Sequence, residues 1–119
     1  MKESLTKQER LKKSKDIQQV FSEGRKTSCP GMRLYWVENG LSWNRIAVTL
    51  SKKFGNAVTR NKTKRHIREI YRKLKKNLGR GYDFIVLAFP KEYSFSERKE
   101  QMISLFRKAG LFGGIRSNS

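Results

Sequence analysis

The feature that most constrains this chain is one segment in which dense positive charge coincides with helical apolar spacing. Residues 52–80 hold twelve Lys and Arg side chains and a single acid, Glu69. Such a block is usually a disordered tail or a nucleic-acid surface. Its apolar residues, however, recur with the period of a helix face that must be buried, at Ile67, Ile70, Tyr71, Leu74 and Leu78. The segment therefore predicts a folded, basic, amphipathic helix over residues 57–78.

An amphipathic helix needs a hydrophobic core to cover, and the chain has enough hydrophobic residues to form one such core. The chain has 119 residues, 36% of them hydrophobic, which fits a single domain over residues 1–119. Its formal charge of +18 makes the surface repel itself unless a polyanion neutralises it. We expect residues 1–12, which are polar and basic, to be flexible until bound, and the small polar tail 113–119 to be disordered.

The same sequence excludes several classes of protein. Cys29 is the only cysteine, so no internal disulfide can form. The longest apolar run, Phe84 to Phe89, is much shorter than the ~20 residues of a membrane span. The first residues lack the apolar segment of a secretory signal. We therefore expect a cytoplasmic protein with no membrane partner.

Two further helices are predicted outside the basic segment. Ser14 is expected to cap the first, over Lys15–Glu23, with Gly24 following its last turn. A capping box formed by Ser94 and Glu97 opens the last helix of the chain.

Three strands complete the expected sheet, and the second is predicted to return from a turn at Asn39-Gly40. The strands are Met32–Glu38, Asn44–Leu50 and Tyr82–Phe89, the last being apolar enough to be buried on both faces. A short extra strand near Arg25–Ser28 is a further option. The order αββαβα predicts an α/β or α+β two-layer sandwich on one small sheet.

The cations of the basic helix gather on one side of it. On a helical wheel, one continuous sector beside the apolar stripe contains Asn61, Lys64, Arg65, Arg68, Arg72, Lys75 and Lys76. Long cations in a row suit a row of phosphates, since each Arg fork can take two oxygens. A solvated helix face would carry both signs, whereas here only Glu69 can pair.

Nucleic acid is therefore the favoured partner of this face, but sequence-specific DNA binding is not expected. A recognition helix reads bases with a few side chains near its N-terminus, and here the basic face runs along the whole helix. A membrane-surface helix is disfavoured because the apolar stripe is needed to cover the sheet.

The chain offers no catalytic constellation and no metal site. His66 is the only histidine and Cys29 is distant in sequence, so a zinc site lacks ligands. The ten acids are scattered, without the close pair of a two-metal nuclease. Gly55 precedes a helix but does not belong to a phosphate-binding GxxxxGK[ST] loop. We expect no catalytic side chain and no tightly bound cofactor.

The central motif also carries a resemblance to a known family. Residues 51–69, SKKFGNAVTRNKTKRHIRE, closely resemble the signature of the bacterial ribonuclease P protein component, which is built around Arg-Asn-(Arg/Lys). Residues 10–24 are similar to the opening helix of that family. The resemblance extends from about residue 10 to about residue 110.

This resemblance implies both a fold and a function. The fold is a ribosomal-protein-like α/β sandwich whose mixed sheet has a left-handed βαβ crossover, contrary to the ~98% right-handed rule. The function is to join the catalytic RNA subunit of ribonuclease P, an endonuclease. That holoenzyme hydrolyses precursor tRNA, removing the 5′ leader in tRNA processing. Catalysis and Mg²⁺ would belong mainly to the RNA subunit.

Family roles transfer by position to two groups of residues. The residues expected to contact the catalytic RNA subunit are Lys52, Lys53, Arg60, Asn61, Lys62, Lys64, Arg65 and Arg68. Those expected to line a cleft for the single-stranded leader are Ile17, Phe21, Tyr35 and Lys91. Stacking on aromatic rings and neutralisation of phosphates hold single-stranded RNA. Ordinary core packing is the alternative role of Phe21 and Tyr35.

Two positions depart from the family pattern. Ile17 stands where the first helix usually has an aromatic residue, and it stacks a base less well. Phe89-Pro90 stands where a basic residue commonly follows the last strand, and Lys91 would substitute only in part.

Two other functions remain as alternatives. A ribosomal or ribosome-assembly protein would share the basic helix but needs no groove for a single strand. A free-standing nuclease would need catalytic side chains that this sequence does not offer.

Overall fold

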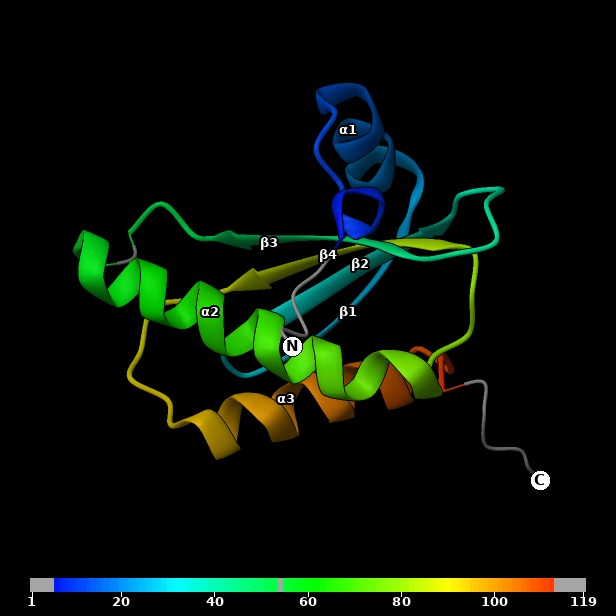
Figure 1. Ribbon diagram of the computed structural model, residues 1–119. Coiled ribbons are helices and arrows are strands. Elements are labelled where there is room, and N and C mark those ends of the chain that lie inside the picture. The colour runs from blue at the N-terminus through cyan, green and yellow to red at the C-terminus, as the bar shows by residue number, and fades with distance from the viewer. Residues whose placement is uncertain (1–5, 54, 113–119) are drawn as a thin grey trace.

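The computed structural model describes residues 6–53 and 55–112, and these form one mixed sheet with helices on both of its faces (Figure 1). The elements are α1 (Ser14–Glu23), β1 (Arg25–Cys29), β2 (Met32–Glu38), β3 (Arg45–Leu50), α2 (Ala57–Leu74), β4 (Tyr82–Ala88) and α3 (Phe95–Lys108). Two 3₁₀ turns, η1 (Lys7–Glu9) and η2 (Lys75–Asn77), complete them. The α+β class and the optional strand near residue 25 are confirmed.

The strand order in the sheet is β1-β2-β4-β3. β2 pairs antiparallel with β1 and β4, whereas β3 pairs parallel with β4. The prediction that residues 44–50 return beside Met32–Glu38 is therefore wrong, because β4 lies between those two strands. The hairpin of this sheet is instead β1–β2, whose connection Pro30-Gly31 has a glycine at a φ of 92°.

Asn39 explains why the predicted turn does not close a hairpin. Its N–H donates to the Gly81 carbonyl at 2.8 Å, and its side-chain amide donates to Asp83 at 2.9 Å. The connection after β2 is thereby fastened to the start of β4. β4 can occupy the middle of the sheet because it is apolar on both faces.

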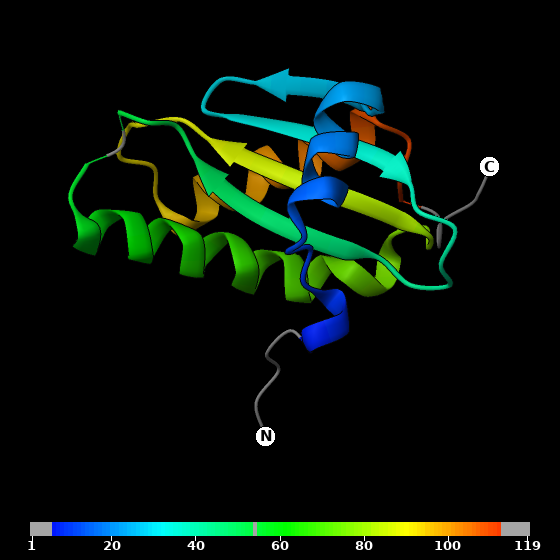
Figure 2. The same cartoon turned by 90° about the horizontal axis from the view of Figure 1, so that it is seen from above.

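The helices divide between the two faces of the sheet. α2 and α3 lie together on one face, and α1 crosses the other (Figures 1 and 2). The β3–α2–β4 connection is left-handed, as the resemblance implied. In Figure 2, β3 runs toward the left, α2 returns behind the sheet, and β4 lies on the side of β3 away from α2.

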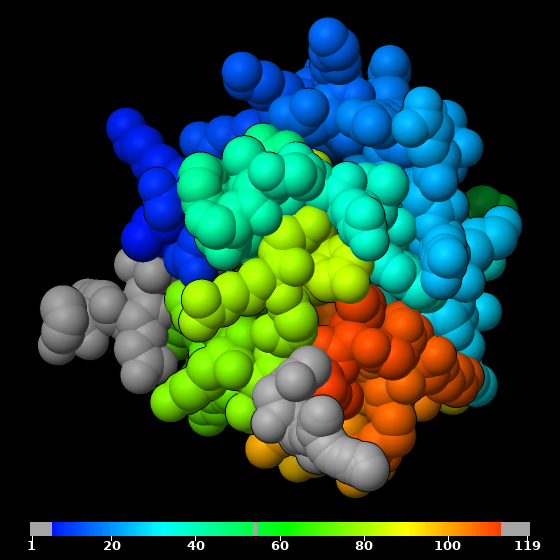
Figure 3. Space-filling model, turned by 90° about the vertical axis from the view of Figure 1, so that its right-hand side faces the viewer, coloured from blue at the N-terminus to red at the C-terminus, as the bar shows by residue number. Residues whose placement is uncertain are grey.

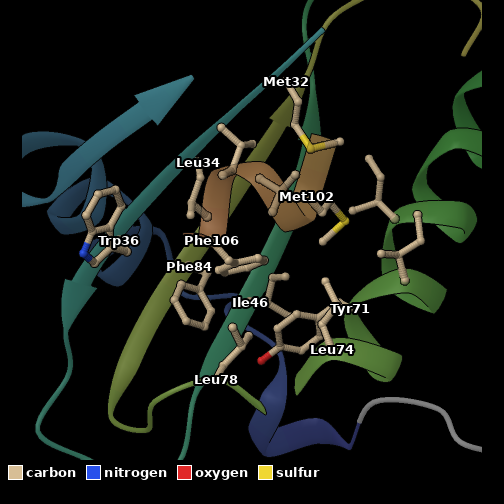
Figure 4. Close-up of a cluster of buried hydrophobic side chains, with 14 of the residues drawn as sticks. Met32, Leu34, Trp36, Ile46, Tyr71, Leu74, Leu78, Phe84, Met102 and Phe106 are labelled. Carbon is tan, nitrogen blue, oxygen red and sulfur yellow. The ribbon is translucent and has the colours of Figure 1, made fainter. Parts of the chain in front are cut away.

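The larger core lies between the sheet and the α2–α3 layer (Figure 4). Alternation along β2 points Met32, Leu34 and Trp36 into it, where they meet the apolar stripe of α2. Ile85 of β4 points to the opposite face and packs with Val20 of α1. The expectation that β4 is buried on both faces is confirmed.

The helix ends follow from their local sequence. Asn56 caps α2 by accepting from the Thr59 N–H at 2.9 Å. The α-helix ends at Leu74, earlier than predicted, and the η2 turn follows it. The Ser94–Glu97 capping box of α3 is confirmed.

The predicted cap of α1 is wrong. Ser14 is the first helical residue, and Lys13 is the cap because the Ile17 N–H already bonds to its carbonyl. Gly24 follows the helix as expected, but with a φ of −79°. A glycine is required there because a Cβ would lie 2.4 Å from the Val20 carbonyl oxygen.

Residues 6–12, assigned by sequence to a flexible segment, make specific contacts with the rest of the chain. The Leu11 side chain is buried and its N–H donates to the Ile46 carbonyl at 2.9 Å. The Trp43 indole donates to the Gln8 carbonyl at 2.9 Å, joining this segment to the loop before β3 (Figure 3). The rest of the segment, 1–5, and the tail 113–119 lie outside the described residues. No helix of the described chain is long and apolar enough to cross a membrane.

Candidate nucleic-acid interface

The basic side of α2 borders a recess at the open edge of the sheet. β3 is one of the two edge strands, and residues 10–12 bridge it only at Ile46. Beyond that bridge lies a recess of about 360 Å³, which we call the edge recess. Its walls carry four cations, Arg10, Lys12, Arg68 and Arg72. The buried Nε of Arg72 has no hydrogen-bond partner among the described residues. These donors converge on a space that suits an anion.

The residues predicted to contact the RNA subunit lie along α2 and the turn that precedes it. Lys52 and Lys53 are exposed in that turn. Arg60, Asn61, Lys62, Lys64, Arg65 and Arg68 are exposed or half-buried on α2. The structure does not bring them all to one side. Arg68 lines the edge recess, whereas Lys62 lines a groove between α2 and α3.

The charge of these eight residues is not neutralised within the described chain. Its three ion pairs are Arg45–Asp16, Arg45–Asp83 and Lys75–Glu9. None of them uses a cation from the predicted set. The predicted RNA-contacting surface therefore retains its full positive potential for an external partner.

His66 faces the groove between α2 and α3. Its ring meets Phe95 edge-on, with 5.3 Å between centroids. Burial, followed by repulsion from Lys62 and Arg65, lowers the pKa of His66 below its ordinary value. The neutral imidazole therefore predominates at pH 7.

Three of the four residues predicted for the leader cleft come together on the α1 face of the sheet. Phe21 of α1 and Tyr35 of β2 meet edge-to-face, with centroids 4.7 Å apart. Ile17 and Tyr35 both pack against the small buried cluster that includes Val20. We call Ile17, Phe21 and Tyr35 the aromatic surface. Phe21 is 45% exposed, which is unlike a core residue and leaves its ring accessible to a base.

Lys91, the fourth, lies elsewhere. It lines the groove between α2 and α3, with its ammonium 5.3 Å from the centroid of the Tyr93 ring. Buried Arg98 of α3 explains this position. Its guanidinium donates to the Phe89 carbonyl at 3.3 Å and lies 4.6 Å from the Tyr93 ring centroid. These contacts hold the loop after β4 against α3 rather than over the aromatic surface.

A partly buried ion-pair network links α1 to the sheet. Arg45 of β3 makes a two-pronged contact to Asp83 of β4, Nε to Oδ1 and Nη2 to Oδ2, both at 2.8 Å. Its Nη1 also reaches Asp16 of α1 at 3.4 Å. The hydrogen bond to Asp83 raises the pKa of Arg45 above its ordinary value. The Asp16 contact therefore adds to the packing of Val20 in linking α1, which carries Phe21, to the sheet.

Sequence reasoning assigned no RNA contact to four charged or aromatic residues near these surfaces. Arg10 and Lys12 lie in the edge recess through a long-range contact that leaves no sequence signal. Arg33 lies beside Tyr35, and Phe89 packs against the Arg33 guanidinium. Alternation along β2 does place Arg33 on the same side as Tyr35, but its contact with Phe89 depends on the pairing of β2 with β4. Among the described residues, no three His, Cys, Asp or Glu side chains are grouped as metal ligands.

Fold and surface together define a small α+β protein whose unpaired cations suit a nucleic-acid backbone. The sequence model of the family described as Ribonuclease P matches residues 5–110. The chain therefore belongs to the ribonuclease P protein family.

Individual relatives agree with this assignment. A ribonuclease P protein component from Caldanaerobacter subterraneus is 38% identical over 114 residues, covering 94% of this chain and 96% of the relative. One from Petrotoga mobilis is 39% identical over 113 residues, covering 89% and 95%. The solved RNase P protein of Staphylococcus aureus matches with a TM-score of 0.81 at 30% identity, covering 87% of this chain and 97% of that one.

Proposed function

We propose that this chain is the protein subunit of ribonuclease P, in which it binds two RNAs on two surfaces. The basic side of α2 with the edge recess binds the catalytic RNA subunit. The aromatic surface on the other face of the sheet binds the single-stranded 5′ leader of precursor tRNA. The protein thereby assists the hydrolytic removal of the leader that generates the mature 5′ end.

The observation that carries this proposal is the row of uncompensated cations along α2. A folded RNA presents phosphates on a rigid surface, and a preformed helix can match them without losing backbone freedom on binding. The edge recess adds Arg10 and Lys12 from the N-terminal segment to Arg68 and Arg72 of α2. Two parts of the chain thus present charge to the same RNA.

The aromatic surface has the chemistry that a single strand requires. Exposed aromatic rings stack on bases of any sequence, which suits leaders that differ from one tRNA to the next. The surface lies on the α1 face of the sheet, whereas α2 lies on the other face (Figure 2). The protein can therefore contact both RNAs at once.

In this proposal the chemistry of cleavage belongs to the RNA subunit. Mg²⁺ bound mainly by that RNA supplies the hydrolytic centre, and the protein lowers the repulsion between two polyanions. The partners are the RNA subunit and precursor tRNA in the cytoplasm, without DNA or a membrane.

The test compares the affinity of protein variants for a bacterial ribonuclease P RNA. Arg65→Ala and Arg68→Ala each remove one cation of α2, and each is expected to weaken binding about tenfold at low salt. Lys99→Ala removes an exposed cation of α3 and is the matched control. If the α3 variant weakens binding as much as the α2 variants, the assigned surface is wrong. Equally tight binding of wild type to a ribosomal RNA fragment would favour the ribosomal alternative.

A further inference from the structure

The uncovered half of the sheet carries a cation that the aromatic surface does not include. Arg33 precedes Tyr35 by two residues on β2, so both side chains lie on the same face. Its register partner on β4 is Leu87, near the C-terminal end of that strand. Figure 2 shows that α1 crosses the other half of this face and leaves the C-terminal ends of β3 and β4 uncovered.

Two contacts hold the Arg33 guanidinium in place. Its Nη1 donates to the Tyr35 hydroxyl at 3.1 Å, and its Cζ lies 5.3 Å from the centroid of the Phe89 ring. Phe89 is itself fixed, because its N–H donates to the Gly31 carbonyl at 3.0 Å. Together with Phe21, which meets Tyr35, these side chains form a continuous row along the sheet.

The charge of Arg33 has no counter-ion within the part of the chain that the structure describes. The ion pairs found there use Arg45 and Lys75 as their cations. A guanidinium has five N–H donors, and the Tyr35 hydroxyl takes one of them. A half-buried cation held by a ring and a neutral hydroxyl is therefore oriented in advance for an external anion.

We infer that Arg33 binds a phosphate of the single-stranded RNA on this face while Phe21 and Tyr35 stack on neighbouring bases. The inference rests on the proposed function, in which that RNA is the 5′ leader. The Tyr35 hydroxyl accepts from Arg33 and keeps its own proton to donate to the same phosphate. Arg33 thus contributes, with the two rings, to the preference for precursor over mature tRNA.

The test uses the holoenzyme reconstituted with a bacterial ribonuclease P RNA. Its ligands are a precursor tRNA and the same tRNA without its leader. Arg33→Gln keeps a polar side chain that can reach Tyr35 but removes the charge. We expect the preference for the precursor, measured as the ratio of the two Kd values, to fall about tenfold.

Salt dependence separates a phosphate contact from a structural effect. One phosphate of a single strand contributes about 0.7 to the slope of log K against log salt. In wild type, the slope for precursor tRNA should be steeper than the slope for leaderless tRNA. In Arg33→Gln, this difference between the two slopes should be smaller by about 0.7. The affinity for the RNA subunit should stay unchanged, which also reports that the variant is folded.

Two further variants keep the test specific. Arg25→Gln is the matched control, because Arg25 pairs in register with Trp36 and lies on the opposite face of the sheet. It should leave the preference at the wild-type value. Arg33→Gln combined with Phe89→Lys returns a cation beside the vacated position and should recover most of the lost preference.

The possible failures are distinguishable. A wild-type preference retained in Arg33→Gln would overturn the role of Arg33 while leaving the leader surface intact. An equal loss in Arg33→Gln and Arg25→Gln would mean that net charge alone acts, and would also overturn it. A wild-type holoenzyme that binds both ligands equally would overturn the leader surface and the inference together.

Discussion

Asp83→Asn should destabilise the protein strongly, because it breaks the ion-pair network between α1, β3 and β4. Asp83 is 4% exposed, and its two oxygens accept from Arg45 and Asn39. An amide at this position turns an NH₂ group toward donors, so at least one Arg45 hydrogen bond is lost. Removing one partner of a buried ion pair costs about 3–5 kcal/mol.

The expected cost here is lower, because Arg45 is not fully enclosed. Its side chain is 22% exposed and keeps Asp16 as a second partner at 3.4 Å. Water and that carboxylate offset part of the loss, so we expect about 2–3 kcal/mol. With a urea dependence of about 1.5 kcal/mol per molar, the unfolding midpoint falls by about 1.3–2 M.

Urea unfolding of the free protein, followed by circular dichroism, measures this shift. Moderate ionic strength is needed because a charge of +18 destabilises the compact state. Asp16→Asn is the matched control: its contact is longer and its side chain 25% exposed, so it should cost less than about 1 kcal/mol. Equal midpoints for the two variants would refute the reasoning that the Arg45–Asp83 pair fastens the sheet.

Three further predictions concern leader binding, the salt dependence of RNA binding and the pH dependence of stability. Tyr35→Ala removes one stacking ring, worth about 1–3 kcal/mol, and should weaken precursor tRNA binding to the holoenzyme about tenfold without affecting the leaderless tRNA; equal losses would contradict it. If the protein neutralises about six phosphates of the RNA subunit, log affinity against log salt has a slope of about −4 to −5, and a flat response would refute the electrostatic account. Burial opposes ionisation of Glu9, but hydrogen bonds from the Thr6 N–H and Lys75 hold its pKa below the ordinary value. Glu9 therefore stabilises the fold above pH ~4.3, and this contribution is lost as the pH falls through the lowered pKa; unfolding midpoints of wild type and Glu9→Gln should converge in acid, and a constant difference would contradict this.

The parts of the fold that sequence predicts are those encoded by local pattern. The apolar spacing of Ile67, Ile70 and Leu74 is a property of one helix, and the capping box at Ser94 involves one turn. The order of strands in the sheet, by contrast, depends on contacts between residues far apart in the sequence. Asn39-Gly40 is a strong local turn signal, yet Asn39 binds Asp83 from far along the chain and β4 enters between β2 and β3. The hand of the crossover came from the resemblance alone.

The residues of the candidate site can be separated in the same way, into those placed by local pattern and those placed by long-range contacts. Charge and helical period placed the cations on α2, and alternation placed Arg33 beside Tyr35. Lys91 and Phe89 could not be located in this way, because Arg98 of α3 holds their loop through contacts with no local signature. That the seven cations and Asn61 contact the RNA subunit, and that the aromatic surface contacts the leader, remain predictions.

Reconstitution of cleavage tests the central claim most directly. The purified protein is added to a bacterial ribonuclease P RNA at low Mg²⁺, where that RNA alone is expected to be slow, and cleavage of a 5′-labelled precursor tRNA is followed. The account predicts that the protein restores cleavage at the mature 5′ end and that the protein alone cuts nothing. Tight, salt-sensitive binding without any stimulation of cleavage would contradict it.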